Sequence, residues 1–306
     1  MEALQFIIIL IFSPMLQGLI KKFKANMQGR LGPGIFQTYY DLARLLKKDM
    51  VVSNVTSWIF RATPYIVFIS TLAASMIVPV ITAQYPFVAV SDVIALIYIF
   101  GLARFFMALA GLDAGTAFGG EGSSREMTVA VLVEPMMVLS IFTAAISAGS
   151  TNLAMIAKTQ NIFYSPSHVL AFSAFIVAVI AETGRIPVDN PDTHLELTMI
   201  HEGMLLEYSG RYLALMEWAH YMKQMLLFTI AVDIFFPFGI VAGALGITGF
   251  AASFGIYTGK MLFMCFLMAL IESTRAKMRF FQLPSLLGGA FVLSALSLLI
   301  YIMMGR

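Results

Sequence analysis

The stretch LLGGAFVLSALSLLIYIMM, residues 286–304, carries no charged side chain and decides the class of fold. A helix of about 20 mostly apolar residues crosses the hydrocarbon core of a bilayer. Other long, largely apolar stretches occupy residues 4–20, 63–83, 90–110, 127–148, 168–182, 212–236 and 258–272. The sequence therefore predicts an all-α, polytopic transmembrane protein of about eight tilted spans, forming a single domain over residues 1–306.

The composition supports a membrane environment and excludes several functions. Of the 306 residues, 59% are hydrophobic and 12% are charged, whereas soluble domains carry about 25% charged residues. A net charge of +2 is too small to indicate a nucleic-acid partner. The single cysteine, Cys265, forms no disulfide within the chain and cannot hold an iron–sulfur cluster alone. Any redox centre is therefore expected in a partner subunit, and this chain is expected to need no cofactor.

The basic residues are divided unevenly between the predicted loops. The predicted inner loops, residues 24–57, 111–126, 184–211 and 274–285, hold most of the lysines and arginines. The opposite loops offer only Lys158 and, at the start of a span, Lys260. The positive-inside rule then predicts that both termini lie outside. Three lysines follow residues 4–20 where a signal peptide would have a cleavage site, so this segment is expected to be a retained first helix.

Two further segments affect the number of membrane elements. The apolar stretch 238–252 is an alternative ninth span, but a ninth span would place the basic cluster 275–279 on the wrong side. Between Ile35 and Leu46, apolar residues recur at helical spacing with charged residues between them. This pattern predicts an amphipathic helix on the inner surface, with a solvated connector as the alternative.

Ionisable residues are concentrated in and beside the inner loop that follows the fifth span. An ionisable group at membrane depth costs several kcal/mol unless it is paired or hydrated, and such groups commonly mark ion pathways. Glu134 also precedes Pro135, which favours a kink and local water. The candidate proton or ion pathway consists of Glu134, Glu182, Asp189, Asp192, Glu196, Glu202, Glu207, Glu217, Lys223 and Asp233. The alternatives are a polar loop that contacts other subunits, or structural ion pairing with Arg104, Arg185 or Lys223.

Other chemistry has little support in the sequence. His194, Glu196, His201 and Glu202 are close in sequence, but their spacing does not match the H-E-x-x-H metal motif. A proton-relay or hydrogen-bonding role is favoured over metal binding, and no metal ligand is predicted. The chain has no G-x-x-x-x-G-K-[ST] phosphate loop. The glycine cluster at residues 119–122 is interpreted as a flexible loop between helices.

Three motifs occur in order along the chain: Arg30 with Gly32-Pro33-Gly34 and Gln37; Gly122-Ser123-Ser124-Arg125-Glu126 followed by Glu134-Pro135; and Gly184-Arg185-Ile186-Pro187-Val188-Asp189 followed by Glu207-Tyr208-Ser209-Gly210. Together they resemble the heel subunit of the membrane arm in respiratory complex I and in membrane-bound group 4 nickel–iron hydrogenases. The resemblance covers nearly the whole chain. It is strongest to the hydrogenase branch, which includes formate hydrogenlyase and hydrogenase-4.

The resemblance implies a non-catalytic subunit that anchors a peripheral redox arm and couples electron transfer to proton or sodium translocation. The implied partners are the iron–sulfur small subunit and the nickel–iron large subunit of a hydrogenase, antiporter-like membrane subunits and the lipid bilayer. The implied location is the cytoplasmic membrane of a prokaryote. By this resemblance the interface with the redox arm comprises Arg30, Gln37, Arg125, Arg185, His194 and His201.

Alternative functions remain open at this stage. Within the family, the alternative is a subunit that serves the quinone site of a complex I-type NADH dehydrogenase, or a sulfur-reducing relative. Where complex I relatives place a further carboxylate in this loop, however, this chain has His194. From other classes come a stand-alone ion or solute transporter that uses the same carboxylates, and an intramembrane metalloenzyme built on residues 194–202.

Overall fold

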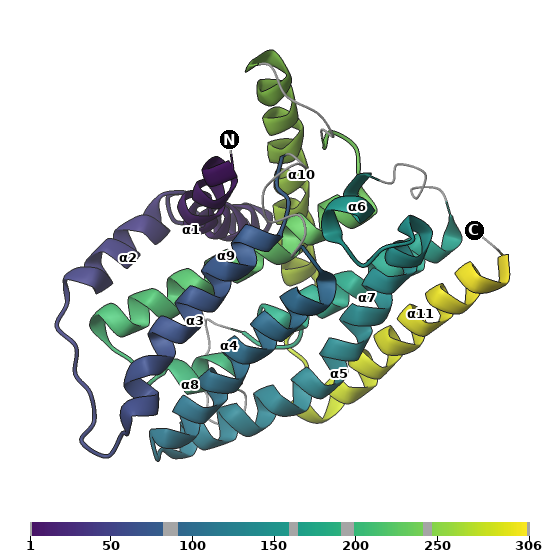
Figure 1. The fold of residues 1–306 in the computed structure, drawn as a ribbon. Helices are drawn as coiled ribbons and strands as arrows, with labels where there is room; N and C mark the ends of the chain where they lie inside the picture. The colour runs from purple at the N-terminus through teal and green to yellow at the C-terminus, as the bar shows by residue number, and fades with distance from the viewer. Residues whose placement is uncertain (1, 82–90, 159–164, 191–198, 241–246, 305–306) are drawn as a thin grey trace.

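The computed structural model describes residues 2–81, 91–158, 165–190, 199–240 and 247–304 (Figure 1). Within these residues the chain forms helices and connecting loops. The helices are α1 (Glu2–Met27), α2 (Gln37–Lys47), α3 (Trp58–Ile77), α4 (Val93–Asp113), α5 (Ala117–Ala148), α6 (Leu153–Lys158), α7 (Pro166–Glu182), α8 (His201–Leu205), α9 (Gly210–Phe235), α10 (Ile247–Thr274), the 3₁₀ turn η3 (Phe280–Gln282) and α11 (Leu283–Met304).

Six helices in the described part of the chain are long and apolar enough to cross a membrane, namely α1, α3, α4, α5, α10 and α11. Helix α7 is also apolar but has only 17 residues. Helix α9 has 26 residues and carries several charged side chains along its length. The all-α, multi-pass membrane fold is confirmed, whereas the number of about eight spans stays a prediction.

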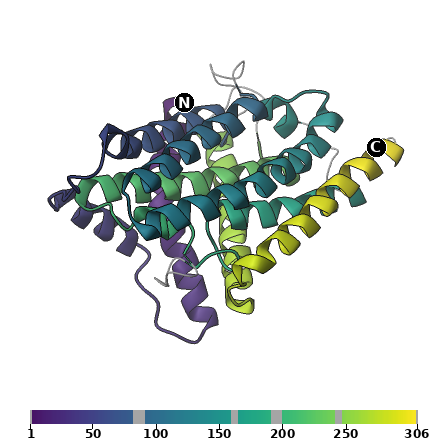
Figure 2. The ribbon, with the colours of Figure 1, turned by 90° about the horizontal axis from the view of Figure 1, so that it is seen from below.

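Helix α9 lies in the interior of the helix bundle. It packs against α1, α3, α7 and α10, and nearly every residue from Tyr221 to its end is buried. Helices α3, α4 and α5 pack in chain order, and α7 and α11 continue this layer beyond α5. Helices α1 and α10 pack against each other and against α9, and they cross the direction of the other helices (Figures 1 and 2). Groups on α9 are therefore surrounded by protein.

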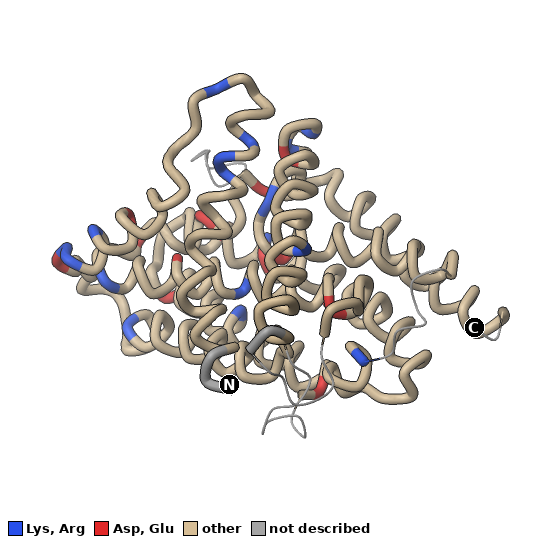
Figure 3. The backbone as a smooth tube through the Cα atoms, turned by 90° about the horizontal axis from the view of Figure 1, so that it is seen from above, with Lys and Arg blue, Asp and Glu red and all other residues tan. Residues whose placement is uncertain are grey.

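The connecting segments meet at two ends of the bundle. At one end Ser209 accepts a hydrogen bond from the backbone of Val51 at 2.9 Å, and at the other Thr151 donates to Asp92 at 2.8 Å. The basic face comprises residues 28–57, 114–116, 183–190, 199–209 and 275–282, and the opposite face comprises residues 78–81, 91–92, 149–152 and 236–240. The tube in Figure 3 shows most lysines and arginines gathered away from the C-terminus. The uneven division of basic residues is therefore present in three dimensions.

Helix α2 is the amphipathic helix expected in the first inner loop. Its Thr38 and Leu42 are buried, and the Thr38 hydroxyl donates to the Pro14 carbonyl in α1 at 2.8 Å. Exposed residues such as Tyr40 lie on its other side. The helix is confirmed, while its place on the bilayer surface stays a prediction.

Prolines inside two helices create attachment points for other elements. A proline has no N–H, so the carbonyl four residues earlier lacks its helical partner. In α1, Pro14 frees the carbonyl of Leu10, and the indole N–H of Trp218 in α9 donates to it at 3.0 Å. Helix α1 is thereby joined to α9 by a hydrogen bond that an uninterrupted helix would not offer.

The same arrangement joins the basic face to α3. Pro64 frees the carbonyl of Phe60, and the Tyr208 hydroxyl donates to this carbonyl at 2.9 Å. The Tyr208 ring also stacks on the Phe60 ring, with 4.0 Å between the ring centroids. Next to it, Gly210 has φ +54°, and a Cβ there would lie 2.6 Å from the Asp49 carbonyl oxygen. Tyr208 and Gly210 therefore hold the start of α9 against α3 and the loop that precedes it.

The interpretation of residues 119–122 as a flexible loop is wrong. Most of the predicted inner loop 111–126 is helical, because α5 begins at Ala117. A Cβ on Gly119 would lie 2.3 Å from the Gly111 carbonyl oxygen, and one on Gly122 would lie 2.9 Å from that of Ile200. These glycines allow helices to approach closely.

The start of α10 also differs from the prediction. The predicted span begins at residue 258, but α10 begins at Ile247. Residues 247–252 are thus the first turns of α10 and form no separate element within the described chain. Residues 241–246, in the rest of the alternative ninth span, lie outside the described residues. The cause of the difference is Gly249, Gly255 and Gly259, which interrupt the apolar pattern without interrupting the helix.

Candidate ion-conducting site

Arg104 of α4 is the centre of a buried charge cluster. Its side chain is buried, and its guanidinium donates hydrogen bonds to Glu134 of α5 and Glu182 of α7. The Nε atom lies 3.6 Å from a carboxylate oxygen of Glu126. One guanidinium therefore faces three carboxylates from two helices, which suits the fixed fork of donors that arginine presents.

Glu182 is also paired with a second cation. The Lys223 ammonium of α9 lies 2.7 Å from the other carboxylate oxygen of Glu182. Removing one partner from a buried ion pair costs about 3–5 kcal/mol, because the remaining charge is left without compensation. Glu182 therefore links α4, α7 and α9, and its charge is balanced by both Arg104 and Lys223.

A small polar cavity lies beside these ion pairs. Its volume is about 40 Å³, and Arg104, Glu126, His201, His220 and Lys223 contribute to its lining. A polar cavity above about 10–15 Å³ can hold a water molecule. The rings of His201 and His220 lie 4.7 Å apart between centroids. The cavity thus brings the Glu126 carboxylate, two imidazoles and the Lys223 ammonium within reach of a shared water molecule.

His201, the first residue of α8, has an unusually low pKa. Burial, followed by the positive charge of Lys223, lowers the pKa of His201 from 6.5 to about 4. The imidazole is therefore neutral at neutral pH and can both accept and donate a proton.

Asp189 connects this cluster to the basic face. The carboxylate accepts hydrogen bonds from the backbone N–H groups of Ile200 at 3.2 Å and His201 at 3.1 Å. The Lys277 ammonium lies 2.7 Å from its other oxygen. Asp189 is buried and so ties the segment before α8 to the loop after α10.

Arg185 belongs to a separate cluster. Its guanidinium donates to Glu272 of α10 at 2.8 Å and to Gln224 of α9 at 2.8 Å, and it also donates to Gln17 of α1. Lys24 of α1 pairs with the second oxygen of Glu272 at 3.1 Å. The carboxylate partner of Arg185 is therefore Glu272 and not one of the predicted pathway acids.

A larger cavity opens beside Arg185. It has a volume of about 320 Å³, and its lining includes Lys21, Lys24, Arg30, Arg185 and Glu272. Two residues of the predicted redox-arm interface, Arg30 and Arg185, thus share one cavity. Four cations and one carboxylate give this cavity a positive character.

The other predicted interface residues are spread over the basic face. Arg125 donates to the Met199 carbonyl at 2.8 Å and lies 5.9 Å from the centroid of the Phe280 ring. Gln37 donates to Asp41 at 3.0 Å within α2. Asp192, His194 and Glu196 lie outside the described residues, so their predicted roles stay predictions.

The remaining predicted acids are placed in two groups. Glu202 and Glu217 lie near Tyr221, and Glu207 is half-buried beside the Tyr208 anchor. Asp233 lies ten residues beyond Lys223 on α9, toward the opposite face. The structure therefore gathers the predicted acids on the basic-face side and leaves Asp233 apart.

Glu134 has an exposed part on the side of the bundle. Its side chain is 39% exposed although it lies midway along α5. The neighbouring Val131 is 68% exposed, and Leu102 of α4 is also exposed. A carboxylate that faces lipid is costly. This flank of α4 and α5 therefore needs protein or water against it.

Several residues of the two clusters were not predicted from the sequence. Glu126 lies in a segment that was interpreted as a loop, and Glu272 at the end of α10 has basic neighbours that suggest a solvated helix end. His220 lies three residues before Lys223 and three after Glu217. This helical spacing puts His220 on the same face of α9 as Glu217 and Lys223, and it could have identified His220 from the sequence.

The described residues contain no group of three His, Cys, Asp or Glu side chains arranged to hold a metal ion. Two members of the alternative metal cluster, His194 and Glu196, lie outside these residues. The metalloenzyme alternative therefore gains no support from the geometry.

Comparison with known families identifies the origin of this arrangement. Residues 1–304 match the family described as NADH dehydrogenase. The chain belongs to this family.

Two relatives come from Escherichia coli (strain K12). The chain is 38% identical to hydrogenase-4 component C over 96% of this chain and 92% of the relative. It is 34% identical to formate hydrogenlyase subunit 4 over 94% of each. The resemblance to the hydrogenase branch is confirmed.

A solved structure supports the fold. The archaeal membrane-bound sulfane sulfur reductase contains a chain that superposes with a TM-score of 0.80, at 16% identity, over 98% of this chain and 99% of that chain. At this identity the likeness shows a common fold.

Proposed function

We propose that this chain is the anchoring and coupling subunit of a membrane-bound hydrogenase complex, in which it links electron transfer to proton or sodium translocation. The proposed partners are the iron–sulfur and nickel–iron subunits of the hydrogenase and antiporter-like membrane subunits. The complex would lie in the inner membrane of a prokaryote, with both termini of this chain outside. The relatives in hydrogenase-4 and formate hydrogenlyase support this assignment over a quinone-reducing complex.

The observation that carries the proposal is the continuous set of buried ionisable groups around Arg104. It begins with Asp189 and His201 behind the basic face and continues through Glu182 and Lys223. It ends at Glu134 on the flank of α5. Buried charges of this kind commonly serve ion pathways, because their cost is otherwise hard to justify in a membrane.

The two ends of this set match two kinds of partner. The cavity that contains Arg30 and Arg185 offers positive charge and hydrogen-bond donors on the basic face, which suits a peripheral redox subunit. The partly exposed Glu134 carboxylate needs a polar neighbour at membrane depth. An antiporter-like membrane subunit against α4 and α5 would supply that neighbour and receive the ion.

The cluster also offers a means of coupling. Arg104 faces Glu126, Glu134 and Glu182, so a change in the charge of one acid changes its attraction to the others. A charge that forms at the redox arm acts first on the groups nearest the basic face, Asp189 and His201. Arg104 and Lys223 would pass that change to Glu134 through small movements of their ion pairs.

The test is to separate hydrogen chemistry from ion movement. Glu134→Gln and Glu182→Gln variants of the whole complex would be placed in vesicles, and the ions translocated per hydrogen molecule would be measured. We expect this ratio to fall in both variants. Asp41→Asn on the exposed side of α2 is the control and should keep the wild-type ratio. An unchanged ratio in both cluster variants would contradict the proposal.

A further inference from the structure

A second pair of ionisable groups lies near the opposite face, apart from the cluster around Arg104. Asp233 of α9 is only 3% exposed, and neither carboxylate oxygen has a hydrogen-bond partner in the described part of the chain. Lys260 of α10 is 8% exposed. The two side chains interact electrostatically, but no hydrogen bond or salt bridge joins them within the described residues. This pair differs from every ion pair on the basic-face side.

Lys260 is held by other groups. Its ammonium donates to the Phe236 carbonyl at 2.6 Å and lies 4.5 Å from the centroid of the Phe238 ring. Phe236 is the C-cap of α9, where unpaired carbonyls give the helix end a partial negative charge. The carbonyl and the ring both stabilise a cation. Lys260 therefore has stable partners as an ammonium, without a carboxylate in contact.

Asp233 lacks the donors that an ionised carboxylate needs. Backbone N–H groups and a cation supply such donors to Asp189, whereas among the described residues Asp233 has only the more distant charge of Lys260. An unpaired charge in an apolar interior is costly, and a buried carboxyl commonly takes up a proton instead. The ionisable residues of α10 that interact with Asp233 are Lys260 and Tyr257.

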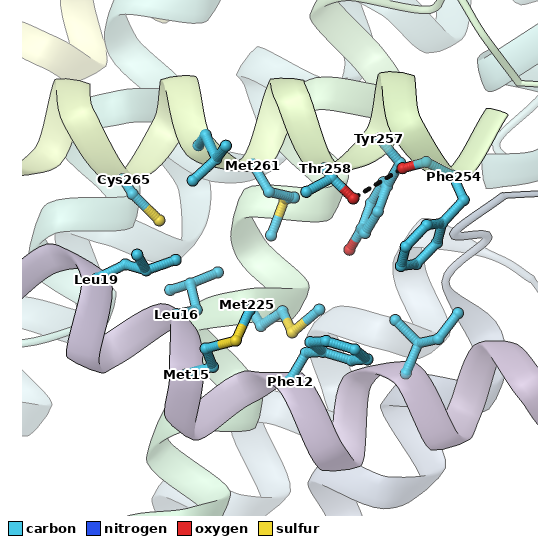
Figure 4. Close-up of a pocket in the computed structure, with 12 residues that line it drawn as sticks. Phe12, Met15, Leu16, Leu19, Met225, Phe254, Tyr257, Thr258, Met261 and Cys265 are labelled. Atoms are coloured by element: carbon cyan, nitrogen blue, oxygen red, sulfur yellow. Dashed lines mark hydrogen bonds between the residues drawn. The ribbon is translucent and has the colours of Figure 1, made fainter. Parts of the chain in front are cut away.

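An apolar segment separates this pair from Lys223. Ten residues of helix correspond to about 15 Å along its axis, and most of the buried residues between Lys223 and Asp233 are apolar, including Met225, Leu226, Leu227, Phe228 and Ile230. The polar exceptions are Gln224, which accepts a hydrogen bond from Arg185, and Thr229. An apolar cavity of about 170 Å³ lies alongside, between α1 and α10 (Figure 4). Apolar cavities of this size stay dry. The pair is therefore isolated from the polar cavity beside Arg104.

One polar contact lies beside this apolar segment. The hydroxyls of Thr229 and Tyr257 are 2.8 Å apart. Thr229 precedes Asp233 by four residues on α9, and Tyr257 precedes Lys260 by three on α10, so each shares a helix face with its partner. Figure 4 shows Tyr257 among the side chains that line the cavity. A hydroxyl pair thus stands one helical turn from the Asp233–Lys260 pair.

We propose that Asp233, beside Lys260, is a proton-binding site near the opposite face of the membrane. The assignment of a role in translocation rests on the proposed function, whereas the binding of a proton does not. A sodium ion would be repelled by the neighbouring Lys260 ammonium, and Asp233 has no ring of oxygen ligands around it among the described residues. The site therefore takes a proton, and the dry segment separates that proton from the inner cluster.

Infrared spectroscopy of the purified complex tests proton binding directly. The carbonyl stretch of a protonated carboxylic acid should be present at neutral pH and should be lost in Asp233→Asn. Asp233→Glu should retain a shifted band, which controls for folding. Asp189→Asn is the matched control and should remove no such band, because Asp189 has donors for both oxygens. The proposal is wrong if Asp233→Asn leaves the spectrum of protonated acids unchanged, or if sodium alone removes the band.

A transport measurement tests the role of the site. In vesicles, Asp233→Asn should lower the number of protons moved per hydrogen molecule, while Asp92→Asn on the same face should not. If Glu182→Gln lowers this ratio and Asp233→Asn does not, the site has no role in translocation although the proposed function stands. If neither variant lowers it, the proposed function fails, and the infrared band still decides whether Asp233 binds a proton.

Discussion

The two halves of helix α9 hold their charges in opposite ways. On the basic-face side, Lys223 contacts a carboxylate that is shared with Arg104, so each charge has an opposite charge in contact. On the opposite side, Asp233 and Lys260 are both buried but do not touch. Paired charges are costly to remove, whereas an unpaired acid that holds a proton behaves as a neutral group. The halves should therefore respond differently to the same kinds of substitution.

The largest effect is expected from Arg104→Met. This change leaves three carboxylates without their common cation, and it should lower the free energy of unfolding by about 3–5 kcal/mol. Arg104→Lys keeps the charge and should cost less. Thermal unfolding of the purified complex measures both, and Arg104→Met combined with Glu182→Gln should recover part of the loss. Lys260→Met is the matching substitution in the opposite half. If Arg104→Met lowered the free energy of unfolding no more than Lys260→Met does, the two halves would not differ in the way proposed.

A smaller effect is expected from neutralising one acid in each half. Glu182→Gln should cost about 3 kcal/mol, because Lys223 loses its partner. Asp233→Asn should cost less than about 1 kcal/mol, because an amide replaces a carboxylic acid of the same shape. The midpoints of denaturation compare the two variants under identical conditions. Equal losses would mean that Asp233 is ionised in the folded protein.

The sequence predicted the apolar helices more reliably than the side-chain pairs that form between them. Long apolar stretches and their basic ends predicted the helices, because these signals depend on neighbours along the chain. Pairing depends on how each helix is rotated against the next. The sequence therefore left Arg104, Arg185 and Lys223 open as partners of the acids. It did not predict Glu272 as the partner of Arg185.

Glycine caused the main errors in the predicted fold. Glycine is common both in loops and where helices approach closely, and composition alone does not separate these uses. Gly119 and Gly122 belong to the second kind, so α5 begins before its predicted start. The same ambiguity near residue 255 hid the first turns of α10 and left Lys260 at the predicted start of a span. The pair with Asp233 was consequently missed.

The hydroxyls of Tyr208 and Tyr257 should also differ in how much they stabilise the fold. Tyr208→Phe should cost about 1–3 kcal/mol, because the buried Phe60 carbonyl that Pro64 frees loses its donor. Tyr257→Phe in the opposite half should cost about 1 kcal/mol or less, because Thr229 still donates to the Met225 carbonyl. Unfolding of both variants in one detergent gives the difference. The anchoring role of Tyr208 would be contradicted by losses of equal size.

The last effect is the pH dependence that His201 adds on the basic-face side. Its pKa is about 4 in the folded protein against an ordinary value of 6.5, so the unfolded chain binds more protons between these values. Stability from this group is complete above pH 6.5 and is lost as the pH falls toward 4.

His201→Gln removes this dependence. The difference in unfolding midpoint between wild type and variant should therefore grow as the pH rises from 4 to 6.5 and then stay constant. The charged groups that act on His201 are Lys223, Asp189, Glu217 and Arg104. The same series in Lys223→Met should therefore raise the lower end of the window and leave the upper end near pH 6.5. A difference that does not change with pH would show that the pKa of His201 is the same in the folded and the unfolded protein. A difference that instead falls as the pH rises above 6.5 would show a raised pKa, so that Lys223 and a cationic His201 would share the cavity.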